Sequence, residues 1–218
     1  VQSASMGAQE SSCRPLGRGP GKYVGDTVRG SRQGRGRCEW KKGANWFEGE
    51  WEDDEPHGMG TACWDSCSSK EQRIVGQFQN GVVEGLGVLS CAGWTTAGEF
   101  VSGKRDGWGE TRGPGTVFQG EYKFDKPHGQ AVVTDDEGVW LEEWLDNKRV
   151  SRIIFRPEST LHLNVQQQAA EAADKAQALA AKISGTGREG GTMEEKIQAD
   201  LRSSFAASMR RASEGGPS

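Results

Sequence analysis

The feature that most constrains this chain is a glycine that returns at a fixed place in five successive segments. The first glycine of each segment is Gly25, Gly49, Gly76, Gly98 or Gly120, so the segments lie 24, 27, 22 and 22 residues apart. A second glycine follows nine residues later in each copy and, in the first four, a third two residues beyond, giving Gly34, Gly36, Gly58, Gly60, Gly85, Gly87, Gly107, Gly109 and Gly129. Five copies in register predict a repeat architecture in which each unit packs against the next.

The residues around these glycines predict that each unit is a β-hairpin. Because side chains alternate along a strand, Phe47, Gly49 and Trp51 share one face, and Glu48 and Glu50 share the other. A glycine inside a strand destabilises it unless a ring or another backbone packs closely there. Two strands of about five residues are marginal alone. Stacking the hairpins therefore predicts a mainly β fold, a single-layer antiparallel sheet of about ten strands with one aromatic-lined face.

This register of aromatic residues and glycines resembles the MORN (membrane occupation and recognition nexus) repeat. The first copy begins YVGDTVRGSRQGRG, the second FEGEWEDDEPHGMG and the fifth FQGEYKFDKPHGQA. The resemblance spans residues 23–149 as about five repeats and a degenerate sixth, in which Glu142 stands where the first glycine is expected. It implies a solenoid of stacked β-hairpins, packed through the glycines named above and through Tyr23, Phe47, Trp51, Phe78, Phe100, Phe118, Tyr122, Trp140 and Trp144.

The composition favours a thin β structure over a single thick core. Hydrophobic residues make up 33% of the chain, below the roughly 45–50% of an average globular domain. Glycine contributes 32 of the 218 residues. Eight tryptophans argue against simple disorder, because disordered chains are poor in aromatic residues. A few large rings are therefore expected to provide most of the burial.

Charge and cysteine usage narrow the classes of partner and compartment. Residues 23–149 hold 15 Lys and Arg against 22 Asp and Glu, which disfavours nucleic acid, whose binding depends on Lys and Arg contacts to phosphate, and flat contact with an anionic membrane. The odd count of five cysteines does not indicate a disulfide framework, so a reducing, intracellular location is expected. This is the cytoplasm or cytoskeleton, including a cilium, or an organelle after removal of a targeting segment. No apolar stretch reaches the ~18 residues of a transmembrane helix.

The segments outside the repeats are predicted as a flexible N-terminal segment and two C-terminal helices. Residues 1–22 are rich in Ser, Gly and Arg. Residues 150–184 contain a strand and an Ala-rich helix at 164–183, and 185–191 form a Gly-rich linker. Residues 192–212 form an amphipathic helix with the apolar stripe Met193, Ile197, Leu201, Phe205 and Met209, before a disordered tail at 213–218.

Two candidate binding surfaces follow. The aromatic face is interpreted as internal packing of the solenoid or as a groove for a partner helix or extended peptide. A single-layer sheet has to cover one face, and the C-terminal helices could do this in cis or a partner in trans. The helix at 192–212 is a candidate partner-binding element, and Ser213, which follows Arg210 and Arg211, is a candidate phosphosite.

No catalytic, cofactor-binding or metal site is predicted. Cys63 and Cys67 lack the companion ligands that zinc requires. His57 and His128 occupy equivalent Pro-His-Gly segments, which indicates a turn rather than a catalytic role. An acidic residue follows the first-glycine position in most copies and is interpreted as part of a solvated face; these residues are Asp26, Glu50, Glu99, Glu121 and Glu143.

Taken together, these features predict a non-catalytic scaffold that binds other proteins of a multi-subunit complex. The MORN resemblance implies a protein-binding platform of cytoskeletal, axonemal or organellar assemblies. One alternative is a membrane-associated module with peripheral lipid contact. Another is the regulatory MORN fragment of a phosphatidylinositol phosphate kinase-like or methyltransferase enzyme. Specificity is expected where the copies differ, namely in the 65–73 insert, the exposed turns and the helix at 192–212.

Overall fold

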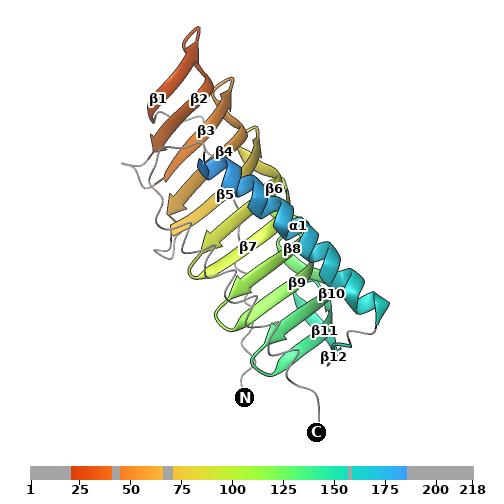
Figure 1. Cartoon of the computed structure of the whole chain (residues 1–218). Helices are drawn as coiled ribbons and strands as arrows, with labels where there is room; N and C mark the ends of the chain where they lie inside the picture. Colours follow the sequence, from red (N-terminus) through yellow and green to blue (C-terminus); the bar gives the residue numbers. More distant parts are fainter. Residues whose placement is uncertain (1–20, 41–44, 66–70, 157–158, 186–218) are drawn as a thin grey trace. The chain divides into compact units, whose positions relative to one another are not determined.

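The computed structural model describes residues 21–40, 45–65, 71–156 and 159–185, and shows one open sheet whose strands follow chain order (Figure 1). Every strand pairs antiparallel with its neighbours in sequence. The strands are β1 Lys22–Val28, β2 Ser31–Trp40, β3 Asn45–Glu52, β4 Glu55–Asp65, β5 Glu71–Gln79, β6 Val82–Cys91, β7 Trp94–Val101, β8 Lys104–Gly113, β9 Thr116–Lys123, β10 Lys126–Asp135, β11 Gly138–Leu145 and β12 Lys148–Ile154. Helix α1, Thr160–Gly185, follows β12.

The predicted mainly β, single-layer antiparallel fold is confirmed, with corrections to its extent. The sheet has twelve strands rather than about ten, and they are 7 to 11 residues long rather than about five. The sixth repeat, predicted to be degenerate, forms a complete hairpin, in which β11 pairs with both β10 and β12. Glu142 does not stop pairing, because strand pairing uses the backbone and leaves the side chain to find its own partners.

A column of glycines crosses the sheet perpendicular to the strands. Gly25 pairs with Gly36, Gly36 with Gly49, and the same pairing continues through Gly60, Gly76, Gly87, Gly98, Gly109 and Gly120. Ala131 continues the column on β10, and Glu142 and Arg152 end it on β11 and β12. The missing side chains leave a trough along one face of the sheet, and aromatic rings fill it.

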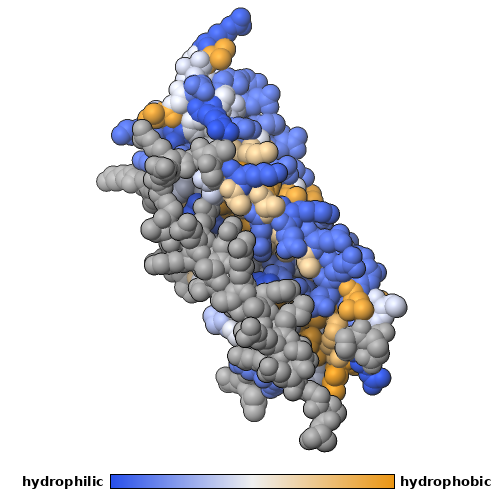
Figure 2. Space-filling model, viewed as in Figure 1, coloured by the Kyte–Doolittle hydropathy of each residue, from blue (hydrophilic) through white to orange (hydrophobic). Residues whose placement is uncertain are grey.

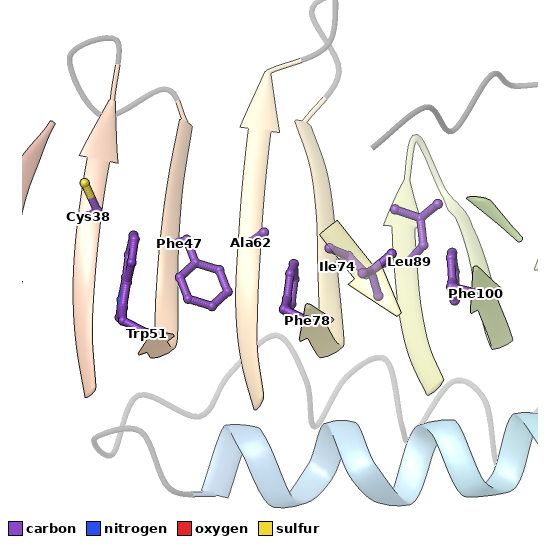
Figure 3. Packing of buried hydrophobic residues seen from close by; sticks show 9 residues of the cluster. Cys38, Phe47, Trp51, Ala62, Ile74, Phe78, Leu89 and Phe100 are labelled. Carbon is purple, nitrogen blue, oxygen red and sulfur yellow. The ribbon is translucent and has the colours of Figure 1, made fainter. Parts of the chain in front are cut away.

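The aromatic core lies over this trough. The Phe47 ring packs edge-on against Trp51 and Phe78, with ring centres 5.2 Å and 4.9 Å apart, and Figure 3 shows these rings side by side with Ile74, Leu89 and Phe100. A second group on the same face lies further along the sheet and consists of Phe118, Tyr122, Ala131, Val133 and Trp144. Aromatic pairs of this geometry contribute roughly 0.5–1.5 kcal/mol beyond their buried area.

Helix α1 lies across one face of the sheet (Figure 1), and its contacts show that this is the face opposite the aromatic rings. Val165 contacts the group formed by Val132 and Leu141, and Ala173 and Ala176 pack with Ala97. The helix therefore crosses several strands, and its alanines allow a close approach. The predicted helix at 164–183 lies within α1, in which Val165, Ala169, Ala172 and Ala176 are buried and Leu179 and Ile183 are half-buried. The second predicted helix, at 192–212, lies outside the described residues.

A buried polar chain links α1 to the sheet. The Gln166 side-chain amide donates a hydrogen bond to Gln119 Oε1 over 3.2 Å, and Gln119 in turn donates to Glu110 Oε2 over 2.7 Å. Arg112 neutralises the buried Glu110 carboxylate. Because buried polar groups lose free energy when they lack a partner, this chain favours one position of α1 along the sheet.

Candidate interaction surface

The packing residues predicted from the sequence occupy the interior of the aromatic face. The second aromatic residue of a hairpin lies opposite the second glycine of the preceding hairpin, as Trp51 does opposite Gly34 and Phe78 opposite Gly58. The same pairing joins Gly85 with Phe100, Gly107 with Tyr122 and Gly129 with Trp144. Phe47, Phe100 and Phe118 are fully buried, whereas Tyr23, Trp140 and Trp144 are half-buried. Trp140 contacts Arg152, and the other five contact rings or apolar side chains of the same face, which leaves little of them for a partner.

The acidic residues that follow the first glycine of the hairpins have a structural role that was not predicted from the sequence. Each of the first five hairpins shifts its strand register beside the second glycine. In the first four, the residue after the first glycine accepts a hydrogen bond from a backbone amide there, and this residue is Gln77 in the third hairpin. Glu50 Oε2 accepts a hydrogen bond from the Met59 amide over 3.1 Å, and Glu99 Oε2 accepts one from the Trp108 amide over 2.9 Å. Asp26 makes the same bond to the residue nine positions on. These carboxylates are thus partly exposed backbone acceptors as well as parts of a solvated face.

The hairpin turns form a row along one side of the sheet, and each turn is bonded to the preceding hairpin. The amides of Asp54, Gly81, Gly103, Asp125 and Asn147 donate to the carbonyls of Arg32, Pro56, Val83, Arg105 and Pro127, over 2.9 to 3.2 Å. Two of these junctions carry an additional ion pair. Arg32 with Asp54 and Arg105 with Asp125 repeat the same arrangement, in which the guanidinium also lies over an aromatic ring. The turns are therefore held in a defined row.

The sixth hairpin ends the aromatic trough with a charged cluster. Only 2% of the Glu142 side chain is exposed, and its carboxylate accepts bonds from Arg149 over 3.0 Å and from Trp144 Nε1 over 3.0 Å. Arg152 bridges Glu142 to Asp135. Burial of Asp135 raises its pKa, but hydrogen bonds from Trp140 and Arg152 outweigh burial and leave the pKa below its usual value. The cluster replaces the glycine trough with paired charges, so an identical hairpin could not stack in the same way.

Both ends of the sheet expose apolar side chains. On β12, Val150, Ile153 and Ile154 are 62%, 54% and 68% exposed, and Leu161 and Leu163 at the start of α1 are also exposed. Figure 2 shows apolar residues gathered at this end of the sheet, whereas the outward side of α1 is largely polar. On β1, at the other end, Val24 and Val28 are exposed. Among the described residues neither strand pairs on its outer side.

The remaining sequence candidates show no arrangement for chemistry in the part of the chain that the structure describes. No group of three or more His, Cys, Asp or Glu side chains there is placed to hold a metal ion. Cys63 is buried and donates to Glu71 Oε1 over 3.0 Å; burial first, and this bond second, raise its pKa to about 12. His57 and His128 lie on β4 and β10, not in turns as predicted, because each hairpin turns before its proline. Cys67, Ser213 and the 192–212 stripe lie outside the described residues.

A shallow hollow of about 300 Å³ lies on the sheet beside β4 and β5. Its lining is mixed and includes Glu50, His57, Met59, Gln77 and Glu84. Of these groups, the Glu50 carboxylate and the Gln77 amide oxygen already accept bonds from backbone amides. None of the described helices is long and apolar enough to cross a membrane.

Comparison with known protein families identifies the repeat. The family model for the MORN repeat matches residues 23–44, 47–66, 75–96 and 118–138, which cover most of the first, second, third and fifth hairpins. The fourth hairpin has Thr96 in place of the first aromatic residue, yet it keeps the pairing of Gly98 with Gly109. MORN repeats mediate contacts with proteins or with membrane lipids. No curated protein matches the chain.

Proposed function

Because the chain belongs to the MORN-repeat family, we propose that it works as a non-catalytic scaffold that holds other proteins in a larger assembly. The observation that carries this proposal is the open sheet with apolar side chains exposed on both terminal strands. An edge strand offers free backbone donors and acceptors together with side chains, and a partner that adds a strand uses both.

The distribution of buried groups supports binding over catalysis. Most of the aromatic and glycine residues that recur along the repeats are used in stacking, and recurring acids such as Glu50 and Glu99 accept hydrogen bonds from backbone amides. The residues of the turn row differ from hairpin to hairpin, and the two terminal strands differ from the strands between them. A scaffold of this kind would recognise its partners through those variable parts, in a cytoskeletal, axonemal or organellar assembly.

Crosslinking mass spectrometry in native extract, combined with size fractionation, tests the scaffold proposal. We expect the protein to elute well above its own mass of 23.6 kDa, with crosslinks from lysines near the turns or β12 to one or a few defined proteins. Elution as a lone monomer at native abundance, without intermolecular crosslinks, would refute the proposal.

A further inference from the structure

The charge of the turn row changes sign between the two halves of the sheet. Glu52 lies directly opposite Glu55 in the second hairpin, whereas Lys123 lies opposite Lys126 in the fifth. Lys104 and Lys148 occupy the place of Lys126 in the fourth and sixth hairpins, and all four lysines are exposed. Because like charges directly opposite each other destabilise a strand pair, folding does not explain the pairing of Lys123 with Lys126.

Exposed apolar side chains lie between these lysines. Val101 is opposite Lys104, and Leu145 is opposite Lys148. Phe124 lies in the fifth turn with 61% of its surface exposed, and the ammonium nitrogen of Lys104 is 5.7 Å from the centre of its ring. We call Val101, Phe124 and Leu145, together with the four lysines, the basic turn strip.

Phe124 is held in a backbone conformation that a bulky residue rarely adopts. Its φ is 50°, and the corresponding positions of the other hairpins carry Arg29, Asp53, Asn80, Ser102 and Asp146. Asp and Asn, at three of these positions, tolerate this region best, whereas Phe124 is the one aromatic residue among the six. The Phe124 amide donates to Asp106 over 3.2 Å, and Arg105 binds both the carboxylate and the carbonyl of Asp125. Strain that the surrounding structure enforces at an exposed position points to a function for the side chain.

We propose that the basic turn strip binds an acidic, extended segment of a partner protein that carries apolar side chains at regular intervals. This proposal rests on the scaffold function and names one of its binding surfaces. Neighbouring turns are two strands apart, about 9.5 Å. Three residues of a polyproline II helix span about 9.3 Å. An apolar residue at every third position would therefore lie beside successive turns, with the acidic residues between them facing the lysines.

The charge pattern favours a short protein segment over a membrane. Glu52, Asp53 and Glu55 stand in the same turn row, and an anionic bilayer would repel them, whereas a short segment contacts the basic half alone. Within that half, Arg105 neutralises Asp125, and Asp146 is the exposed acid that remains in its turns. Asp106 and Glu84 are half-buried and accept the amides of Phe124 and Ser102, so the four exposed lysines still outnumber the acids at these turns.

Fluorescence anisotropy with a labelled peptide of four Leu-Glu-Pro units tests the proposal on the full chain. We expect binding that weakens roughly tenfold in Phe124→Asn, at least tenfold in the double variant Lys123→Glu and Lys126→Glu, and markedly between about 50 mM and about 500 mM salt. A peptide of Leu-Lys-Pro units is expected not to bind. The matched control reverses two exposed lysines of α1, Lys175 and Lys182, and should bind as the unaltered chain does.

The stability of the variants separates binding from folding. Asn tolerates the backbone conformation of residue 124 better than Phe, so Phe124→Asn should melt no lower than the unaltered chain. Absence of peptide binding by the unaltered chain, or equal binding by all variants, overturns the proposal. So does Phe124-dependent sedimentation with phosphatidylserine-containing vesicles in the absence of peptide binding, or a dimer that the lysine reversals dissociate. If the native complex persists in the strip variants, the scaffold stands and only the strip fails.

Discussion

Replacing Gly60 with alanine tests whether ring-over-glycine packing stabilises the sheet. A Cβ atom on Gly60 would lie 2.4 Å and 2.5 Å from two ring atoms of Phe47, about 1 Å closer than an ordinary contact of about 3.5 Å. Phe47 is fully buried between Trp51 and Phe78. The ring therefore has no free space into which to retreat.

The expected destabilisation follows from two limits. Overpacking a tight core costs typically 1–3 kcal/mol, and expelling the ring altogether approaches the roughly 3–5 kcal/mol of a Phe-to-Ala change. Loss of glycine flexibility in the unfolded chain offsets about 0.4–1 kcal/mol. We expect Gly60→Ala to lower the free energy of unfolding by about 2 kcal/mol. With an m-value of roughly 2 kcal/mol/M, the urea midpoint would fall by about 1 M.

Gly87 provides a matched control, because it occupies the same column in the next hairpin. A Cβ atom there would meet Phe100 and Val83 at 3.4 Å, an ordinary contact. We therefore expect Gly87→Ala to shift the midpoint by less than about 0.3 M, given the same m-value. Tryptophan fluorescence and circular dichroism in urea would follow both variants. Equal midpoint shifts for the two substitutions would refute the argument that ring contact, rather than glycine in a strand as such, sets the cost.

Three further outcomes are expected. Because the pKa of Asp135 is lowered in the folded state, its contribution to stability is present above the unfolded pKa of about 3.9 and is lost as the pH falls through the folded pKa. The melting temperature of Asp135→Asn should therefore fall less on acidification than that of the unaltered chain. An equal fall in both proteins would contradict this expectation. Since Cys63 is buried and keeps its proton at neutral pH, it should resist alkylation by iodoacetamide until urea unfolds the chain. Peptide mass mapping would measure the alkylation. Rapid alkylation of Cys63 in the folded chain would count against its burial. Glu142→Ala removes the carboxylate that Arg149 and Arg152 share, although Arg152 keeps its ion pair with Asp135. The change should cost about 2–3 kcal/mol, less than the ~3–5 kcal/mol of a fully buried pair because the arginines are partly exposed. Calorimetry should show a melting temperature lower by about 4–10 °C, and an unchanged value would mean that Glu142 adds nothing to stability.

The division of the sheet into two faces explains how a single layer buries enough apolar surface. On the aromatic face, rings of consecutive hairpins cover the glycine column and one another. On the opposite face, the later hairpins are apolar, with Leu86, Val88, Ala97, Val132 and Leu141 packed in the clusters that α1 joins. The early hairpins are polar on that face, where Arg37 pairs with Glu39 and Glu48. The contacts of α1 therefore fall where the sheet carries apolar residues.

The alternation of side chains along a strand explains which part of the candidate surface could be predicted from the sequence. Phe47, Gly49 and Trp51 had to share a face once they were in a strand, since side chains of a strand alternate by covalent geometry. The exposed turns were expected to carry specificity because they vary between copies. The unusual backbone of Phe124 and the opposition of Lys123 with Lys126 depend on turn conformation and register, for which the sequence pattern carries no direct signal.

By itself, the sequence determined the repeat, its hairpin unit and the residues that fill the aromatic face, because glycine and ring spacing act over a few residues. Only the tertiary structure decided which face α1 covers, how the acids cap the register shifts and how Glu142 is neutralised. An alanine-rich helix stripe has little directional preference of its own, so its place depended on the small and apolar side chains of distant strands. The glycine column likewise became continuous only when strands β1 to β9 came into register, because a glycine belongs to the column through the glycine that lies opposite it.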